Sequence, residues 1–104
     1  MNQVLQTDQF RAAIKEIGKY IARESGSRKI ATDFLQRIGE KCQIYARQPE
    51  LGELRPEVGE GLRCFHVGNY VIFYRPHEKG ILLLAIIHGA RDIPAVFRRL
   101  FDTR

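Results

Sequence analysis

The run Ile81–Ile87 consists of seven consecutive apolar residues and constrains the fold more than any other feature of the chain. Successive side chains of a strand point to opposite faces of a sheet, so an unbroken apolar run predicts a central strand that is covered on both faces. The run is far shorter than the roughly 20 residues that cross a bilayer. The N-terminus, MNQVLQTDQF, is polar and carries no recognisable signal peptide, so we expect neither a membrane protein nor a secreted one.

Residues 61–75, GLRCFHVGNYVIFYR, predict a pair of antiparallel strands ahead of this central strand. Gly68 and Asn69 suit a two-residue hairpin loop with glycine at its first position, a type II′ turn. This turn pairs residue 67 with 70, 65 with 72 and 63 with 74. One face then carries Arg63, Phe65, Val67, Tyr70, Ile72 and Tyr74, and the other carries Leu62, Cys64, His66, Val71, Phe73 and Arg75. Both faces are largely apolar, so we expect one to be covered and the other to be partly exposed.

Two apolar stripes at helical spacing precede the strands. The first consists of Phe10, Ala13, Ile14, Ile17, Tyr20 and Ile21, and the second of Ala31, Phe34, Leu35, Ile38, Cys42 and Tyr45. Ser25-Gly26-Ser27 separates them, so residues 8–48 predict an antiparallel helical hairpin. Neither helix can bury its stripe alone, so the hairpin is expected to cover one face of the sheet.

The remaining segments complete one α+β domain over residues 1–104. Residues 1–6 suggest a short edge strand, and residues 61–88 a three-stranded antiparallel meander. Residues 49–61 contain two prolines and three glycines and are expected to lack regular structure. Residues 92–101 predict a short C-terminal helix, capped by Asp92. The predicted fold is thus an antiparallel helical hairpin packed on a small antiparallel sheet, with a short helix at the end.

The charge of the chain points weakly to an anionic partner. The net charge is +5 and the sequence pI is about 9.6. The excess is spread evenly, with nine Lys and Arg against six acids in residues 1–52 and eight against six in residues 53–104. There is no basic arm or tail. A small nucleic-acid-binding protein therefore stays open as an interpretation.

Known catalytic and metal-binding motifs are missing from the sequence. His66, His77 and His88 lie eleven residues apart without HxxxH or HExxH spacing, so we expect no metal site and no cofactor. The serines of the helical turn are remote from His88, which argues against a Ser/His/Asp triad, and no phosphate-binding glycine loop is present. Cys42 and Cys64 have no CxxC partner and are interpreted as small buried hydrophobes in a reducing cytoplasm.

A set of cationic and aromatic residues remains as a candidate site. It comprises Arg63, Arg75, His88 and Arg91, with Tyr70 and Tyr74 nearby. Such a set could hold a phosphate and move protons. Equally, the arginines could pair with carboxylates and the tyrosines could pack in the core, which would make the set structural.

Several motifs in order resemble the ParE toxins of the RelE/ParE superfamily: PELG at 49–52, RPE at 55–57, GLRxFxVGxYVIFYR at 61–75 and HGARD at 88–92. ParE toxins are the toxin halves of bacterial type II toxin–antitoxin modules, which serve plasmid and chromosome maintenance. The resemblance implies a cytoplasmic inhibitor of DNA gyrase that blocks replication and arrests growth without a catalytic centre. It also implies a hetero-oligomer with a cognate antitoxin, whose disordered segment folds on the toxin. It implies no direct specific nucleic-acid binding by the toxin alone.

The alternative within the same superfamily is a RelE-like, ribosome-dependent mRNA endonuclease. Its candidate catalytic residues would be Arg63, Arg75, His88 and Arg91. Arginine can steady a phosphorane but is a poor acid or base at neutral pH, which leaves His88 as the one good proton carrier. The tyrosine that RelE-like enzymes use near the chain end is missing after His88. We therefore expect a protein that is not an enzyme, with no catalytic residues.

The expected contacts with the target are the charges that remain once a core is built, and a second set of residues is expected to contact the antitoxin. For the target these are His88, Arg91, Arg98 and Arg99. For the antitoxin they are Arg63, Tyr70, Tyr74 and Arg75. The two helices and an open sheet edge are expected to leave an apolar groove for the antitoxin.

Overall fold

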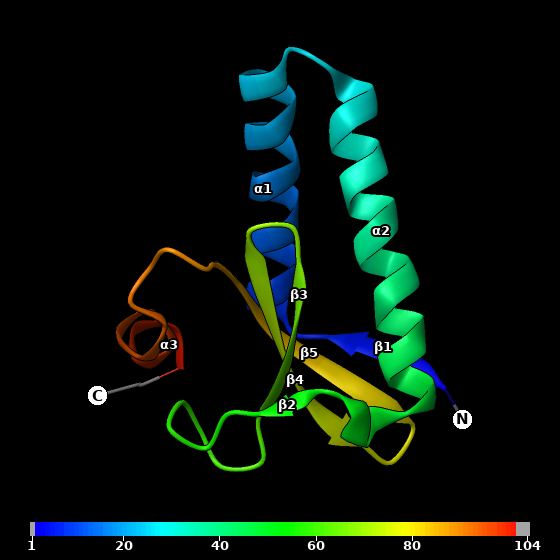
Figure 1. Cartoon of the computed structure of the whole chain (residues 1–104), viewed down its shortest axis with the longest axis vertical. Coiled ribbons are helices and arrows are strands. Elements are labelled where there is room, and N and C mark those ends of the chain that lie inside the picture. Colours follow the sequence, from blue (N-terminus) through cyan, green and yellow to red (C-terminus); the bar gives the residue numbers. More distant parts are fainter. Residues whose placement is uncertain (1, 102–104) are drawn as a thin grey trace.

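A computed structural model describes residues 2–101 and has the predicted α+β fold (Figure 1). Five strands form one sheet, a helical hairpin packs on one of its faces, and a short helix packs on the other. In chain order the elements are β1 (Gln3–Gln6), α1 (Asp8–Ser25), α2 (Arg28–Arg47), the 3-10 turn η1 (Pro49–Leu51), β2 (Glu53–Leu54), β3 (Arg63–Val67), β4 (Tyr70–His77), β5 (Gly80–His88) and α3 (Ile93–Phe101).

The sheet is larger than predicted and is mixed. Its strand order is β1-β5-β4-β3-β2, and the predicted antiparallel meander forms its β3–β4–β5 part. The predicted antiparallel sheet is present as β3–β4–β5. The sheet as a whole is mixed, because β1, whose pairing was not predicted, lies parallel to the first half of β5, from Gln3 beside Gly80 to Gln6 beside Leu83. Gly80 permits this pairing: its φ is 147°, and a Cβ there would lie 2.0 Å from the carbonyl oxygen of Gln3.

The predicted hairpin register is confirmed. Val67 pairs with Tyr70, Phe65 with Ile72 and Arg63 with Tyr74. Gly68 takes a positive φ of 58°, as the first position of a type II′ turn requires. The two faces of the strand pair are therefore divided as the sequence predicts.

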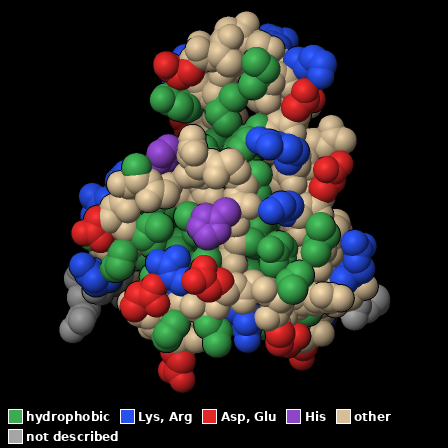
Figure 2. Space-filling model, viewed as in Figure 1, with side chains coloured by type: hydrophobic (Ala, Val, Ile, Leu, Met, Phe, Trp, Pro, Cys, Tyr) green, Lys and Arg blue, Asp and Glu red, His purple; other side chains and the backbone are tan. Residues whose placement is uncertain are grey.

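The helical hairpin is also confirmed, and its caps explain its ends. The Thr7 hydroxyl accepts the Phe10 N–H at 3.1 Å and begins α1, and Gly26 ends it in the left-handed conformation with φ 68°. The Ser27 hydroxyl accepts the Ile30 N–H and begins α2. The turn between the helices projects beyond the sheet (Figure 1), and hydrophobic side chains reach the surface of this projecting part (Figure 2).

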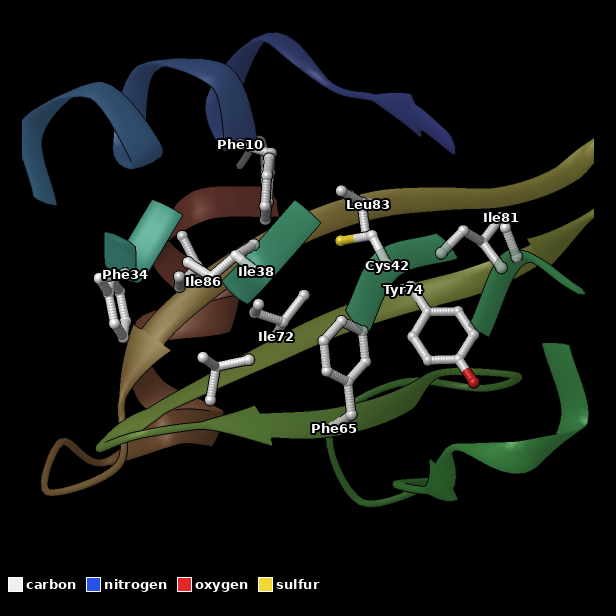
Figure 3. Packing of buried hydrophobic residues seen from close by; sticks show 12 residues of the cluster. Phe10, Phe34, Ile38, Cys42, Phe65, Ile72, Tyr74, Ile81, Leu83 and Ile86 are labelled. Carbon is white, nitrogen blue, oxygen red and sulfur yellow. The ribbon is translucent and has the colours of Figure 1, made fainter. Parts of the chain in front are cut away.

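Two apolar clusters hold the layers together. The larger lies between the helical hairpin and the sheet (Figure 3) and includes Phe10, Phe34, Ile38, Phe65 and Ile72. The smaller lies on the opposite face, where Cys64, Val71 and Phe73 pack against Phe97 and Phe101 of α3. This second face was expected to be partly exposed. This expectation is confirmed: α3 covers the apolar residues of this face, while His66 and Arg75 on the same face are exposed.

The expectation that residues 49–61 have no regular structure was wrong. The segment contains η1 and the two-residue strand β2, which pairs with β3. Hydrogen bonds from two distant side chains hold it. The Tyr74 hydroxyl donates to the carbonyl oxygen of Pro49 at 2.7 Å, and Arg63 Nη1 donates to the carbonyl oxygens of Glu50 and Gly52 at 2.8 and 2.7 Å.

The C-terminal helix begins at Ile93, one residue after its predicted cap. The Asp92 carboxylate accepts the N–H of Ala95 at 3.2 Å and so caps the first turn. Over residues 2–101, none of the helices is both long and apolar enough to cross a membrane.

Candidate functional site

A groove of about 530 Å³ lies where α1, the end of β5 and α3 meet, and we call it the α1–α3 groove. The chain builds it in two steps. β1 pairs only as far as Leu83, so α1 borders the later part of β5 on one face of the sheet. After His88 the chain turns at Gly89, whose N–H donates to the Asn69 carbonyl at 2.8 Å, and α3 then packs on the other face.

The floor and walls of the groove are apolar. Side chains of three elements line it: Ala13, Ile17 and Tyr20 of α1, Ile86 and Ile87 of β5, and Val96 and Leu100 of α3. Tyr20 is 50% exposed and Leu100 is 41% exposed, so each helix presents one large hydrophobic side chain to solvent at this groove. Exposed hydrophobic side chains that line one concave surface are typical of a binding site.

The rim of the groove is mainly cationic. His88, Arg91 and Arg99 line it and are exposed. No carboxylate within residues 2–101 forms an ion pair with Arg91 or Arg99. The acidic residue at the rim is Glu16, which lies 3.7 Å from the ammonium group of Lys19. The groove therefore offers positive charge around an apolar centre.

His88 is held in a defined orientation. Its Nδ1 accepts the N–H of Ala90 at 3.1 Å, and its ring stands edge-on to the ring of Tyr70, with the centroids 5.2 Å apart. Burial raises the pKa of Tyr70 above its ordinary value, so this phenol stays protonated at neutral pH. The groove thus contains one histidine and one carboxylate, that of Glu16, which lies beside the ammonium group of Lys19.

Three of the four residues predicted to contact the target lie at this groove. They are His88, Arg91 and Arg99. The fourth, Arg98, is exposed in the last turn of α3 but does not line the groove. Of the residues predicted to contact the antitoxin, Tyr70 also lies here.

The predicted cluster of Arg63, Arg75, His88 and Arg91 does not form. Tyr70 pairs with His88, whereas Tyr74 pairs with Arg63. Four residues of strand separate these positions by about 13 Å, so Arg63 and His88 lie at different ends of the hairpin. Arg75 donates to the carbonyl oxygen of Glu60 from Nε and Nη2, at 3.3 and 2.9 Å.

Two of the predicted antitoxin contacts are structural in this fold. Tyr74 has no exposed surface, and its hydroxyl donates to Pro49 and accepts the N–H of Gly52. The prediction that it contacts a partner was wrong, because the hairpin register places it on the face that packs against the helices. Arg63 is half-buried and is bound to the same segment. Arg75 is exposed beside Glu60.

The groove residues that sequence reasoning missed are Tyr20 and Leu100. Tyr20 was assigned to an apolar stripe and so to the core, and Leu100 only to the short C-terminal helix. The signal that could have found Tyr20 is its place near the C-terminal end of α1, close to the turn that projects beyond the sheet (Figure 1). Leu100 carried no comparable signal, since its exposure depends on which side of α3 faces the sheet.

Neither the cysteines nor the histidines form a metal centre in the described part of the chain. No three His, Cys, Asp or Glu side chains gather closely enough there to hold an ion. Cys42 and Cys64 are both buried and unbridged, as expected of packing residues. Burial raises the pKa of the Cys42 thiol to about 11, which makes it a poor nucleophile at neutral pH.

The relationship of this chain to known proteins agrees with the resemblance seen in its motifs. Residues 4–93 match the family described as “ParE toxin of type II toxin-antitoxin system, parDE”. The chain is 25% identical over 95 residues to “Toxin ParE3” of Caulobacter vibrioides (strain ATCC 19089 / CIP 103742 / CB 15), an alignment that covers 91% of this chain and 94% of that protein. The family match spans the helical hairpin and all of the sheet except Gln3, and it ends at the first residue of α3. The chain therefore belongs to the ParE toxin family of type II toxin–antitoxin systems.

Proposed function

We propose that this protein arrests growth by inhibiting DNA gyrase, without catalysing a reaction of its own, and that a cognate antitoxin neutralises it. Membership of the ParE family supports the role of toxin. The observation that carries the non-enzymatic part is the division of the candidate catalytic residues between two ends of the β3–β4 hairpin. A phosphoryl-transfer site needs those groups around one phosphate.

The bonds of the arginines support this interpretation. Arg63 and Arg75 each hold backbone carbonyl groups of the 49–61 segment. Neither faces His88 across the sheet. His88 is therefore left in the groove with Arg91 and Arg99, a protonated phenol and the Glu16 carboxylate. The groove lacks the two strand arginines that the endonuclease interpretation requires around the same phosphate.

The target-binding surface in this proposal consists of His88, Arg91, Arg98 and Arg99. All four are exposed, and within the described residues the three arginines have no carboxylate partner. Such charges guide association with an acidic protein surface and fix its orientation. We place the protein in the cytoplasm, where gyrase and a co-expressed antitoxin are found.

The antitoxin contacts in this proposal include Tyr70, which lines the groove, and Arg75, which is exposed beside Glu60. The complex is a hetero-oligomer of toxin and antitoxin. A segment that is disordered in the free antitoxin becomes ordered on the toxin, a mode that covers a large surface at modest affinity per unit area.

A supercoiling assay with purified gyrase and relaxed plasmid tests the proposal. We expect the toxin to inhibit supercoiling or to accumulate cleaved DNA, and equimolar antitoxin to restore activity. In bacteria that express the toxin alone, DNA synthesis should stop before protein synthesis. Normal gyrase activity at saturating toxin, with DNA synthesis unaffected, would reject the proposed target.

A ribosome-dependent mRNA endonuclease is the second candidate. One observation favours it: His88 lies at the same groove as Arg91 and Arg99. In this case, protein synthesis would stop first, mRNA would be cut at defined positions, and His88→Ala would abolish the cleavage. Intact mRNA in cells that have already stopped DNA synthesis would exclude it.

A further inference from the structure

We propose that two copies of this chain pair through the outer side of β1, which we call the β1 edge, and so join their two five-stranded sheets into one continuous sheet. The inference goes beyond the proposed function and does not rest on it. Three observations carry it: the edge is unpaired, its residues are uncharged, and two leucines beside it belong to neither apolar cluster.

The two edges of the sheet are built differently. One edge is β2, which has only two residues and includes the charged Glu53. Beyond β2, Lys41 Nζ donates to the carbonyl oxygen of His66 in β3 at 3.2 Å and so occupies a backbone group that β2 leaves uncovered. Short strands and lysine side chains protect sheet edges from pairing with other chains. The other edge is β1, which lies beside β5 (Figure 1) and has no charged residue between Gln3 and Gln6.

The hydrogen bonds of β1 identify its free backbone groups. The N–H groups of Gln3 and Thr7 donate to carbonyl oxygens just before β5 and within it, at 2.7 and 3.1 Å. Backbone groups of a strand point alternately to its two sides, so those of every second residue face β5. The N–H and C=O groups of Val4 and Gln6 therefore point away from the sheet, where no strand of residues 2–101 pairs with them. Arg11 Nη2 reaches the Gln6 carbonyl oxygen at 3.5 Å, but that oxygen has a second lone pair.

A second copy of β1 completes this edge under two-fold symmetry. In an antiparallel pair centred on Leu5, Val4 of each copy lies opposite Gln6 of the other, and these two residues exchange their free N–H and C=O groups. Leu5 then lies opposite Leu5 of the second copy, with the two Cα atoms about 4.5 Å apart. The free groups of the strand are thus complementary to those of its own copy.

Leucine side chains beside the edge supply the apolar part of this contact. Leu5 pairs with Leu82 of β5, and both are half-buried. Among the described residues, neither belongs to the two apolar clusters, whereas the neighbouring Val4 packs against the larger one. Successive side chains of a strand alternate, so Leu5 lies on the face opposite the helical hairpin. Pairing at the β1 edge places Leu82, Leu5 and their copies in one row and removes their apolar surface from water.

The charge of the chain limits where two copies can meet. Each copy has a net charge of +5, so contact between cationic surfaces of two copies is repulsive. The β1 edge is uncharged, and the charged residues that follow it most closely in the sequence, Asp8 and Arg11, form an ion pair with each other at 3.2 Å. A second copy can therefore approach at this edge without bringing like charges together.

Pairing at the β1 edge leaves the α1–α3 groove open. β1 covers only the first half of β5, from Gly80 to Leu83, whereas the groove is lined by Ile86, Ile87 and His88 at the end of that strand. Two strands of four residues form an interface below the roughly 1,600 Å² of standard size, so we expect a reversible dimer with a Kd in the micromolar range. Such a dimer presents two grooves at once.

Sedimentation equilibrium of the full-length protein measures the association. Gln6→Pro removes an N–H group that points away from β5, a position at which an edge strand tolerates proline. Two intermolecular hydrogen bonds are lost by symmetry, so the Kd of the dimer should rise at least about tenfold. Gln6→Lys should raise it at least about threefold, because the two substituted positions lie diagonally across the pair, about 7–8 Å apart. Gln36→Lys, at an exposed position of α2, is the matched control, and circular dichroism establishes that each variant is folded.

A cysteine substitution tests the register of the pair. Leu5→Cys places two thiols at opposed positions, and a Cα separation of about 4.5 Å permits a disulfide. Oxidised glutathione should therefore convert most of this variant to a covalent dimer. Ile30→Cys, at a 52% exposed position of α2, is the control and should stay largely monomeric under the same conditions. The native Cys42 and Cys64 are buried, so they should not react.

Wild-type protein that stays monomeric at about 0.1 mM would overturn the inference. So would a dimer whose Kd is unchanged in folded Gln6→Pro and whose Leu5→Cys variant does not cross-link, since the two copies would then meet at another surface. Gyrase inhibition is measured separately in the supercoiling assay. A toxin that dimerises through the β1 edge but leaves gyrase active would contradict the proposed target and leave this inference standing.

Discussion

The hydroxyl group of Tyr74, in the fourth strand, accepts a hydrogen bond from the backbone N–H of Gly52 at 2.9 Å, across 22 positions of sequence. The same hydroxyl donates to Pro49, so one buried side chain fixes both η1 and the start of β2. Residues 49–52 and Tyr74 belong to separate sequence motifs and are therefore joined in the fold by these two hydrogen bonds. Two of the motifs that resemble ParE toxins, at 49–52 and 61–75, therefore contain residues whose contact stabilises the fold.

Tyr74→Phe should destabilise the protein without changing its shape. The substitution removes one hydroxyl and leaves the Gly52 N–H and the Pro49 carbonyl without this partner in a buried region. A cost of roughly 1–3 kcal/mol in the free energy of unfolding is expected. Urea denaturation followed by circular dichroism measures it, and Tyr20→Phe, whose side chain is half-exposed, provides the comparison. Equal stability of the two variants would show that the contact contributes nothing.

Gly52→Ala and Gly39→Ala should act in opposite directions. A Cβ at Gly52 would lie 2.2 Å from the Tyr74 hydroxyl oxygen, so the ring or the segment must move, at a cost of roughly 1–3 kcal/mol. Gly39 lies inside α2, and a Cβ added there would meet no atom of another element within 4 Å, so alanine should raise helix stability by roughly 0.5–1 kcal/mol. Thermal unfolding of both variants checks the pair. A stabilised Gly52→Ala would contradict the tight packing described.

Stability should fall at alkaline pH through Cys42. Burial raises the pKa of this thiol from 9.0 to about 11. Between these two pKa values the unfolded chain loses the thiol proton, whereas the folded protein keeps it. The contribution of Cys42 to the free energy of unfolding is therefore intact below pH 9 and is lost as pH rises towards 11. The loss in the free energy of unfolding amounts to roughly 3 kcal/mol at its limit. Cys42→Ala should show a shallower decline between about pH 9 and 11 than the wild type; parallel curves would refute the assignment.

Arg91→Ala and Arg99→Ala should reduce gyrase inhibition while leaving the fold intact. Both side chains are exposed and have no carboxylate partner in residues 2–101, so stability should change by less than about 0.5 kcal/mol. The toxin concentration for half-inhibition should rise at least about tenfold in the double variant, equivalent to about 1.4 kcal/mol. Arg47→Ala is the control. If the double variant inhibits gyrase at the same concentration as the wild type, these arginines do not contribute to target binding.

The sequence was most informative where local rules decide the structure. Alternation along residues 62–75 and the glycine at 68 predicted the hairpin register. The two helical stripes and the break at Ser25-Gly26-Ser27 predicted both long helices. The structure of segments that depend on distant side chains was not predicted. β2 forms because Arg63 and Tyr74 hydrogen-bond to a proline- and glycine-rich stretch, and no local pattern in that stretch predicts a strand.

The candidate site was predicted only in part for a related reason. Residue types identified the cations, but not which of them meet. Arg63 and Arg75 donate hydrogen bonds to backbone carbonyl groups. His88, Arg91 and Arg99 instead lie at a groove whose α1 wall includes Tyr20. Such a grouping depends on how α1 and α3 cross the end of β5, which a linear pattern does not contain.

The parallel pairing of β1 with β5 also sets an order of events during synthesis. The Thr7 hydroxyl donates to the carbonyl of Leu84, a contact across 77 positions. The N-terminal strand β1 therefore cannot pair until β5 has been synthesised. Contacts of such long range form slowly, and domains complete their folding only once the late strand has left the ribosome. The α1–α3 groove needs β5 and α3, which are translated last. A nascent chain therefore cannot present its complete groove until synthesis is almost finished.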